Sequence, residues 1–496
     1  MKFGILQYII VWVLLLSVLP CMAHGGDGSF GTADYKIELL GSVATGNQTP
    51  FWVVSNKYGT IPLNSNNGYL RASTFYNRTS NNGFRMAAGI DVVACAPRYR
   101  NVFVQQVFAE IGYKSIMLTI GSKESYTSLW DKNLSSGDMV ASSNARPIPE
   151  INILIPNFTI IPATRGWLQF KGNFAVGRSF DTDYLKRFVN ENQVFVRNTQ
   201  WHNKSLHVRI LDKRNDFPLT ATVGIRHYAQ WAGTSSDERI GTQPHSFLDL
   251  IRIITGHSGG SDASLSDQIN VLGNHYGTYD IKIGYIGQKF SIHTYKQHYF
   301  EDTSGMELFN TADGLFGLQA TLNNCPWLNR IVVEYIATRD QSGPFHFITF
   351  DHSKYPGYGG GNDDYYNNGE YTTGTSYFNR SLGSPLITSP EYNGDGSLGF
   401  KNNRIQAWHI GLGGYLSQYM AYRMLVTKSE NWGTNSRPFL KKKDQFSAGV
   451  RLAYCHPKLN GWQFACEIAV DKGTLLTDNI GLCLSVSKTG IIKIGK

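Results

Sequence analysis

The chain has 496 residues and a formal charge of +9, and 17% of its residues are charged, against about 25% in an average soluble protein. Its 27 tyrosines, 27 phenylalanines and 51 glycines favour strands, aromatic girdles and turns. The chain has no long basic tract, and Lys441–Lys443 is typical of a solvated turn, which argues against a nucleic-acid-binding protein.

An export signal is the first element in chain order. Lys2 precedes an apolar stretch over residues 5–19, and Cys21–Ala23 offers a small-residue cleavage site. We therefore expect residues 1–23 to be a signal peptide that is removed. An uncleaved anchor is the alternative, and Pro20 argues against a lipoprotein signal. No later apolar run approaches the roughly 20 residues of a transmembrane helix, so a membrane location would require strands.

Most of the remaining chain alternates apolar and polar residues in short segments, as half-buried strands do. Near the C-terminus two such segments flank Asn460-Gly461, which predicts a tight hairpin turn. In a membrane barrel the apolar face meets lipid and the polar face lines the lumen. We predict an all-β fold, one closed antiparallel transmembrane barrel of about 18 strands over residues 24–496. The strand-like segments are residues 35–43, 69–78, 84–94, 101–112, 114–121, 150–161, 165–177, 193–202, 205–211, 219–230, 278–286, 288–299, 312–322, 328–339, 404–415, 419–428, 444–455, 460–470 and 478–486.

Residues 243–273 break the strand pattern with helical periodicity. Four apolar residues at i, i+3, i+4 and i+7 predict a helix between a Ser246 N-cap and Gly256, and a second helix follows from Leu265 to Leu272. We expect this insert to cross a barrel mouth as a small helical plug, and a surface helical hairpin is the alternative. The apolar residues of the first helix are Phe247, Leu250, Ile251 and Ile254.

Three motifs carry a resemblance to a known family. They are Arg146-Pro147-Ile148-Pro149-Glu150-Ile151, His227-Tyr228-Ala229-Gln230-Trp231-Ala232-Gly233 and Leu272-Gly273-Asn274-His275-Tyr276-Gly277-Thr278-Tyr279-Asp280. In this order they resemble the capsule assembly Wzi family, its Bacteroides-type members in particular, over residues 35–496. The resemblance implies an outer-membrane barrel of about 18 strands, closed toward the periplasm by a small helical bundle, that acts as a surface lectin for capsular polysaccharide. The chain departs from many outer-membrane barrels at its end, Ile494-Gly495-Lys496, which has no terminal aromatic residue.

The third motif favours a structural role over ligand contact. Its glycines permit sharp turns after the insert, and its Asn and His side chains can bond to loop backbone. The residues to which we assign this role are Gly273, Asn274, His275, Gly277 and Asp280.

A long segment, residues 340–403, is the strongest candidate for binding. Long loops of such barrels face outward, tyrosine rings stack on the apolar face of a pyranose, and Asp, Asn and Arg bond to hydroxyls. The alternative is a hydrophilic loop that folds over the lumen. In the second motif, donors stand beside stacking surfaces, as in sugar sites, but these residues also suit a barrel rim. The candidate polysaccharide-binding residues are Asp363, Asp364, Tyr365, Tyr366 and Tyr371, with His227, Tyr228 and Trp231.

Catalytic and metal chemistry find little support. The five cysteines that follow the signal have no C-x-x-C spacing, so we expect neither a disulfide framework nor a metal or other cofactor. Residues 256–260 match G-x-S-x-G around Ser258, but a helix precedes the serine where a nucleophile elbow needs a strand. We therefore expect a non-enzymatic, monomeric outer-membrane protein of a Gram-negative bacterium whose partners are surface polysaccharide and lipid. A diffusion channel for sugars or small solutes is the alternative, and a surface hydrolase is a third.

Overall fold

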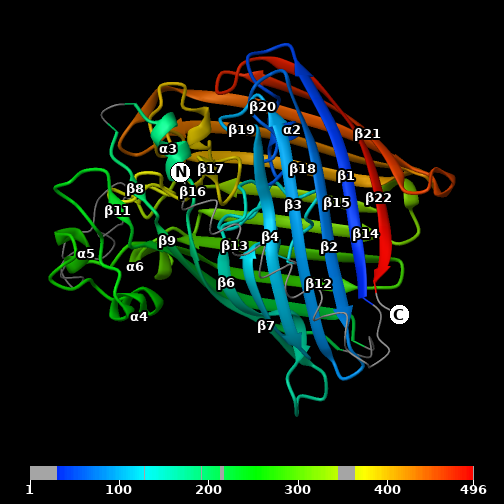
Figure 1. The fold of residues 1–496 in the computed structure, drawn as a ribbon, viewed down its shortest axis with the longest axis horizontal. Helices are drawn as coiled ribbons and strands as arrows, with labels where there is room; N and C mark the ends of the chain where they lie inside the picture. The colour runs from blue at the N-terminus through cyan, green and yellow to red at the C-terminus, as the bar shows by residue number, and fades with distance from the viewer. Residues whose placement is uncertain (1–30, 128, 191–192, 213–216, 344–362, 495–496) are drawn as a thin grey trace.

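The computed structural model describes residues 31–127, 129–190, 193–212, 217–343 and 363–494. Eighteen antiparallel strands form one sheet (Figure 1). The first and last strands, β1 (Gly31–Ala44) and β22 (Asn479–Ile494), pair with each other and close the sheet into a barrel. The closed antiparallel barrel predicted from the sequence is thus confirmed, while the predicted signal peptide, residues 1–23, lies outside the described residues.

Each barrel strand pairs with the strands that precede and follow it around the wall. Two predicted segments, residues 193–202 and 205–211, contribute to one continuous strand, β9 (Gln200–Ile210), because the ladder with β7 continues unbroken through Asn203 and Lys204. The other barrel strands are β2 (Asn67–Thr79), β3 (Phe84–Ala96), β4 (Val102–Tyr113), β5 (Ile116–Ser122), β6 (Glu150–Ile160), β7 (Leu168–Arg178), β10 (Leu219–Trp231), β12 (Asn274–Ile286), β13 (Phe290–Phe300), β14 (Gly314–Leu322), β15 (Arg330–Ala337), β18 (Ile405–Ser417), β19 (Met420–Gly433), β20 (Pro438–Cys455) and β21 (Trp462–Gly473).

The helices are short, and among the described residues none has the length and apolar character needed to cross a membrane. The predicted caps of the first insert helix are confirmed: the Ser246 hydroxyl accepts from the backbone N–H of Asp249 at 3.2 Å, and Gly256 ends the helix with a φ of 67°. Besides the barrel strands the structure contains α2 (Phe51–Val54), α3 (Thr182–Phe188), α4 (Phe247–Thr255), α5 (Leu265–Ile269), α6 (Thr303–Met306), the 3-10 turns η1 (Pro326–Leu328), η2 (Pro390–Tyr392) and η3 (Pro457–Leu459), and the short pairs β8 (Val196–Arg197) with β11 (Thr234–Ser235) and β16 (Ser376–Tyr377) with β17 (Arg380–Ser381).

The two ends of the barrel differ. The start of β1 at Gly31, the end of β22 at Ile494 and short turns such as residues 114–115 and 418–419 lie at one end, called here the terminal end. The connections 45–66, 123–149, 232–273 and 338–404 leave the opposite, long-loop end, where α3, α4, α5 and α6 lie at the left of Figure 1. These connections follow β1, β5, β10 and β15, the first, fifth, ninth and thirteenth strands of the barrel in chain order, which places all of them at the end opposite Gly31.

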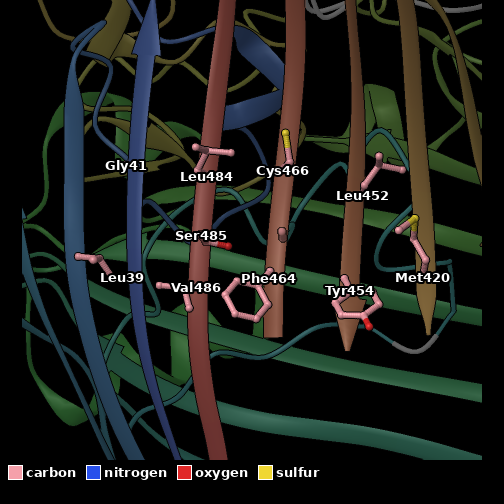
Figure 2. Close-up of a pocket in the computed structure, with 11 residues that line it drawn as sticks. Leu39, Gly41, Met420, Leu452, Tyr454, Phe464, Cys466, Leu484, Ser485 and Val486 are labelled. Carbon is pink, nitrogen blue, oxygen red and sulfur yellow. The ribbon is translucent and has the colours of Figure 1, made fainter. Parts of the chain in front are cut away.

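The outer wall is apolar, as the alternation of the sequence predicts. Asn460 and Gly461, with φ values of 49° and 89°, lie in the hairpin connection between β20 and β21 as predicted. The connection spans residues 456–461 and includes η3, so it is longer than the tight turn expected from the sequence. A groove of about 500 Å³ lies on the outer surface of this wall. Figure 2 shows Leu39, Phe464 and Val486 side by side along it, with Tyr454 next in the row. Its lining is apolar, which suits acyl chains and not sugars.

Candidate functional site

Three connecting segments fold back into the barrel and pack within its lumen. Their described residues, 45–66, 123–127, 129–149 and 363–404, are called here the lumenal plug. Their apolar side chains form one core with inward-facing residues of the strands. Leu134, Met139 and Ile387 of the plug are fully buried. The structure does not show the predicted helical plug, because irregular segments fill the lumen and the insert helices lie elsewhere.

A buried charge network ties the plug to the wall. Arg226 on β10 donates from Nη1 to Asp138 Oδ2 of the plug at 2.7 Å, and from Nε to Asp280 Oδ2 on β12 at 2.7 Å. His207 Nε2 lies 2.8 Å from Asp280 Oδ2, and the Gln297 amide donates to both carboxylates at 3.2 Å. Each buried charge therefore has a partner of opposite sign, as a low-dielectric interior requires.

Glu334 on β15 makes a second attachment. Its carboxylate accepts from the Ser135 hydroxyl at 2.8 Å and from the backbone N–H of Ser136 at 2.6 Å. On β18 the ring nitrogen Nε2 of His409 donates to the carbonyl oxygen of Leu134 at 2.7 Å. A Cβ on the neighbouring Gly411 would collide with that carbonyl oxygen, so the glycine permits the close approach of the plug to the wall.

A cavity of about 380 Å³ lies between the plug and the terminal end of the barrel. Three cations converge there on Glu467: Arg423 at 2.6 Å, Arg451 at 3.4 Å and Lys57 at 3.5 Å. Burial, and next the neighbouring Arg423, lower the pKa of Lys57 to about 8. Charged side chains line part of this cavity, and more of them are positive than negative, which suits an anionic solute. Its other charged lining residues are Glu38, Arg71, Lys132 and Arg330.

Aromatic rings and charged side chains also gather at the long-loop end, in a set called here the rim cluster. The rings of Tyr99, in the β3–β4 connection, and Tyr184, on α3, meet edge to face with centroids 5.0 Å apart. Arg187 donates to the Tyr99 carbonyl oxygen at 3.3 Å, and Arg100 pairs with Asp183 at 2.6 Å. Tyr99 and Tyr184 are half-buried residues, whereas Arg100, Asp183 and Arg187 are exposed. Stacking surfaces beside exposed hydrogen-bonding groups are what a sugar site needs.

Asp181, at the start of α3, attaches the helix of the rim cluster to the plug. Its carboxylate accepts from the backbone N–H of Phe378 at 3.3 Å, and burial raises its pKa to about 6. The Phe378 ring lies against Tyr184, with centroids 5.5 Å apart. The rim cluster could not be predicted from the sequence, because Tyr99 and Tyr184 belong to segments without strand periodicity and come together only in the folded barrel.

The predicted tyrosine site in residues 363–371 is buried. Tyr365 and Tyr366 have no exposed surface and Tyr371 is 2% exposed, so their rings offer no free face to a sugar. The hydroxyl of Tyr366 donates to the Met139 carbonyl oxygen inside the plug. The expectation of an outward loop is therefore wrong for these residues. Tyrosine is compatible with a core once its hydroxyl has a partner, so a tyrosine-rich run did not by itself indicate exposure.

The two aspartates of the same run are held within the protein. Asp363 is buried and accepts from the Ser342 hydroxyl at 2.9 Å, and Asp364 accepts from the Asn403 amide at 2.5 Å. Burial, and next the charge of Asp302, raise the pKa of Asp363 to about 7. Asp364 therefore serves a contact within the plug, and Asp363 serves one between the plug and Ser342.

The rim candidates from the second motif do not converge. Tyr228 faces the lumen and stacks on Tyr276 at 5.4 Å, whereas His227 and Trp231 face the outer wall because side chains alternate along β10. His227 Nε2 lies 2.8 Å from Nδ1 of His275, and Trp231 is buried beneath the insert. These three side chains consequently do not form one site.

The residues of the third motif make contacts within the protein. Gly273 has a φ of 85°, and a Cβ at Gly277 would collide with the Arg226 carbonyl oxygen. Asn274 donates to the Gln230 side chain at 2.6 Å, and Nε2 of His275 donates to the Leu272 carbonyl oxygen at 2.7 Å. Asp280, the last residue of the motif, is the carboxylate that holds Arg226.

Evidence for catalytic or metal chemistry is slight. Ser258 is exposed in the loop after α4, with no strand before it. Within the described ranges no group of three or more His, Cys, Asp or Glu residues is arranged to hold a metal ion. Cys95, Cys325, Cys455, Cys466 and Cys483 are free thiols.

The fold is similar to that of solved outer-membrane barrels, although no family model matches the chain and it has no match among curated proteins. One solved structure is Wzi, an outer-membrane protein involved in group 1 capsule assembly in Escherichia coli and described as a carbohydrate-binding β-barrel. It is 10% identical with a TM-score of 0.55, over 96% of this chain and 87% of Wzi. OccK5 of Pseudomonas aeruginosa is 9% identical with a TM-score of 0.46, over 93% of this chain and 98% of its own. At these identities the likeness concerns the fold alone.

Proposed function

We propose that this protein is a non-enzymatic outer-membrane barrel that binds capsular or other surface polysaccharide and helps to retain it at the cell surface. The observation that carries the proposal is the lumenal plug, which is attached to the wall through Arg226, Glu334 and His409. A lumen packed in this way leaves little room for solutes to pass. The barrel is therefore better suited to present a binding surface than to conduct solutes. The likeness of the fold to Wzi supports the same function.

The orientation follows from the usual arrangement of such barrels, with short turns in the periplasm and long loops outside. The terminal end then faces the periplasm, and the rim cluster faces the capsule. Its tyrosine rings suit the C–H face of a pyranose, and Arg100 and Arg187 suit hydroxyl or carboxylate groups of the polymer. The rim cluster replaces the buried tyrosines of residues 363–371 as our proposed binding site.

Binding of purified surface polysaccharide to the full-length protein in lipid nanodiscs tests the proposal. Each stacked ring should contribute about 1 kcal/mol to binding. The affinity of the double variant Tyr99→Ala/Tyr184→Ala for the polysaccharide should therefore be lower by about tenfold or more. Tyr113→Ala is the matched control, since Tyr113 is exposed on the outer wall near the terminal end. Unchanged affinity in the double variant would remove the site from the rim, and no binding by the wild type would overturn the function.

A diffusion channel is the second candidate, and the cationic cavity favours it. The cavity opens on the terminal side of the plug and would take an anionic solute if the plug moved aside. Stable open conductance of the wild-type protein in planar bilayers would favour this function over polysaccharide binding.

A further inference from the structure

The insert between β10 and β12 lies against the outside of the barrel wall. Arg226 and Gln230 bond to the plug, so the alternating residues Ala229 and Trp231 face outward. Both are buried, and they pack with Ile253 of α4 and with Leu272. The helices therefore cover the outer surface of the wall beside the rim.

The insert also covers polar groups of that outer wall. Lys204 on β9 donates to the Ile254 carbonyl oxygen at the end of α4. His202, on the same outward face of β9, is fully buried, and His275 bonds to the Leu272 carbonyl oxygen. The outer face of these strands therefore carries polar side chains where the insert packs against it.

The insert buries Ile253 against the wall but exposes other large apolar side chains while two acidic ones are buried. Asp249 and Asp267 are buried, whereas Phe247 is 78% exposed and Leu265 and Ile269 are each 71% exposed. Leu248 and Ile251 are exposed beside Phe247 on α4. Apolar side chains at i and i+4 give each helix one exposed apolar face.

The apolar surface of the barrel leads up to the insert. Toward the terminal end the outward residues of the same strands are apolar and exposed, among them Leu206, Val223, Ile225 and Ile281. In a membrane barrel this surface is the lipid-facing belt. The insert covers the polar positions that follow the belt and presents apolar side chains in their place, so the apolar surface continues past the edge of the strands.

We propose that α4 and α5 form a membrane-surface anchor whose exposed apolar faces enter the headgroup and acyl-chain boundary of the outer leaflet beside the barrel. Amphipathic helices bind at that depth through their buried apolar area. The occupant of these faces is leaflet lipid. The inference rests on the proposed outer-membrane location. The anchor would hold the long-loop end of the barrel at a fixed height above the leaflet.

Photolabelling of the full-length protein in lipid vesicles with an apolar, bilayer-partitioning carbene reagent tests the anchor. Peptides spanning residues 245–272 should be labelled to an extent comparable with β10, and residues 394–397 of the plug should not. The triple variant Phe247→Ser/Leu265→Ser/Ile269→Ser should lower labelling of the insert at least about tenfold. Leu440→Ser is the control, since Leu440 is fully exposed at the same end of the barrel.

The outcomes separate the anchor from the proposed location. Labelled strands with an unlabelled insert would overturn the anchor alone, and unlabelled strands would overturn the membrane location as well. If the insert is protected in cross-linked pairs and becomes labelled only on dilution into excess lipid, the occupant is a second copy of the chain and the lipid anchor is wrong. Unchanged heat-modifiable mobility on gels would show that the triple variant still forms the barrel.

Discussion

Arg226 and Asp138 form an ion pair at 2.7 Å that joins the barrel wall to the segment inside it. The two residues are 88 positions apart, and both side chains are almost completely buried. Asp138 also accepts from the indole N–H of Trp130 at 2.9 Å, and its other oxygen accepts from two backbone N–H groups of the plug. The pair therefore orders the plug itself as well as attaching it.

Asp138→Asn should loosen the plug while the barrel remains closed. Removing one charge of a buried pair costs about 3 kcal/mol or more, because Arg226 keeps only Asp280 as its counter-charge. We expect intermittent ion conductance in planar bilayers, with heat-modifiable mobility unchanged. Asp395→Asn, in an exposed ion pair of the same plug, is the control and should stay sealed. A sealed Asp138→Asn protein would show that this pair does not hold the plug.

Gly411→Val tests the attachment of the plug to β18. A branched side chain there would displace Leu134 and break its hydrogen bond to His409. We expect faster amide exchange in residues 123–149 and conductance similar to that of Asp138→Asn. Gly41→Val is the matched control, because a Cβ at Gly41 on the outer wall would meet no atom within 4 Å. Exchange equal to that of the wild type would mean that the plug does not depend on this contact.

The buried tyrosines should affect stability more than sugar affinity. Tyr365→Ala empties a fully enclosed volume and should destabilise the plug by about 3–5 kcal/mol. Tyr366→Phe removes only the hydroxyl that donates to Met139 and should destabilise it by about 1 kcal/mol. Denaturant unfolding and polysaccharide binding, measured on the same preparations, check this order. A loss of binding by Tyr366→Phe at unchanged stability would return the binding site to this segment.

Docking of the insert should depend on pH through Asp267. Burial, and next the nearby Glu370, raise the pKa of its carboxyl from 3.8 to about 7. A released insert ionises near the ordinary value, so docking is strongest below about pH 4, weakens as the pH rises toward 7 and is constant above it. Intrinsic-rate-corrected amide protection of residues 264–273 should fall between pH 5 and 7, by at most about tenfold per pH unit. Asp267→Asn should abolish this dependence, and a dependence that persists in the variant would exclude Asp267 as its origin.

Most of the wall could be predicted from the sequence. Alternation such as that around Asn460-Gly461 is local, because lipid on one face and lumen on the other impose a period of two on every strand. The capped helix α4 was equally local, since Ser246 and Gly256 stand at its ends. The ends of the strands could be predicted less well. β9, for example, is one strand where the sequence predicts two segments.

The filling of the lumen could not be predicted in the same way. Asp138 reaches Arg226, and Leu134 reaches His409, through contacts between residues far apart in the sequence. Irregular segments also have no period from which such contacts could be predicted. The tyrosines of residues 363–371 look hydrophilic beside their Asp, Asn and Gly neighbours, yet their hydroxyls find partners inside the barrel. The apolar residues of the insert indicated a buried face, whereas the structure exposes Phe247 and Leu265 outside the wall.

The conductance of the wild-type protein in planar bilayers tests the central claim most directly. If three segments seal the lumen, membranes that contain the assembled protein should show no stable open level at moderate voltage. Assembly is verified on the same sample by heat-modifiable mobility. A steady, ohmic open state in the wild type would contradict the sealed barrel and with it the account of this protein as a binding surface.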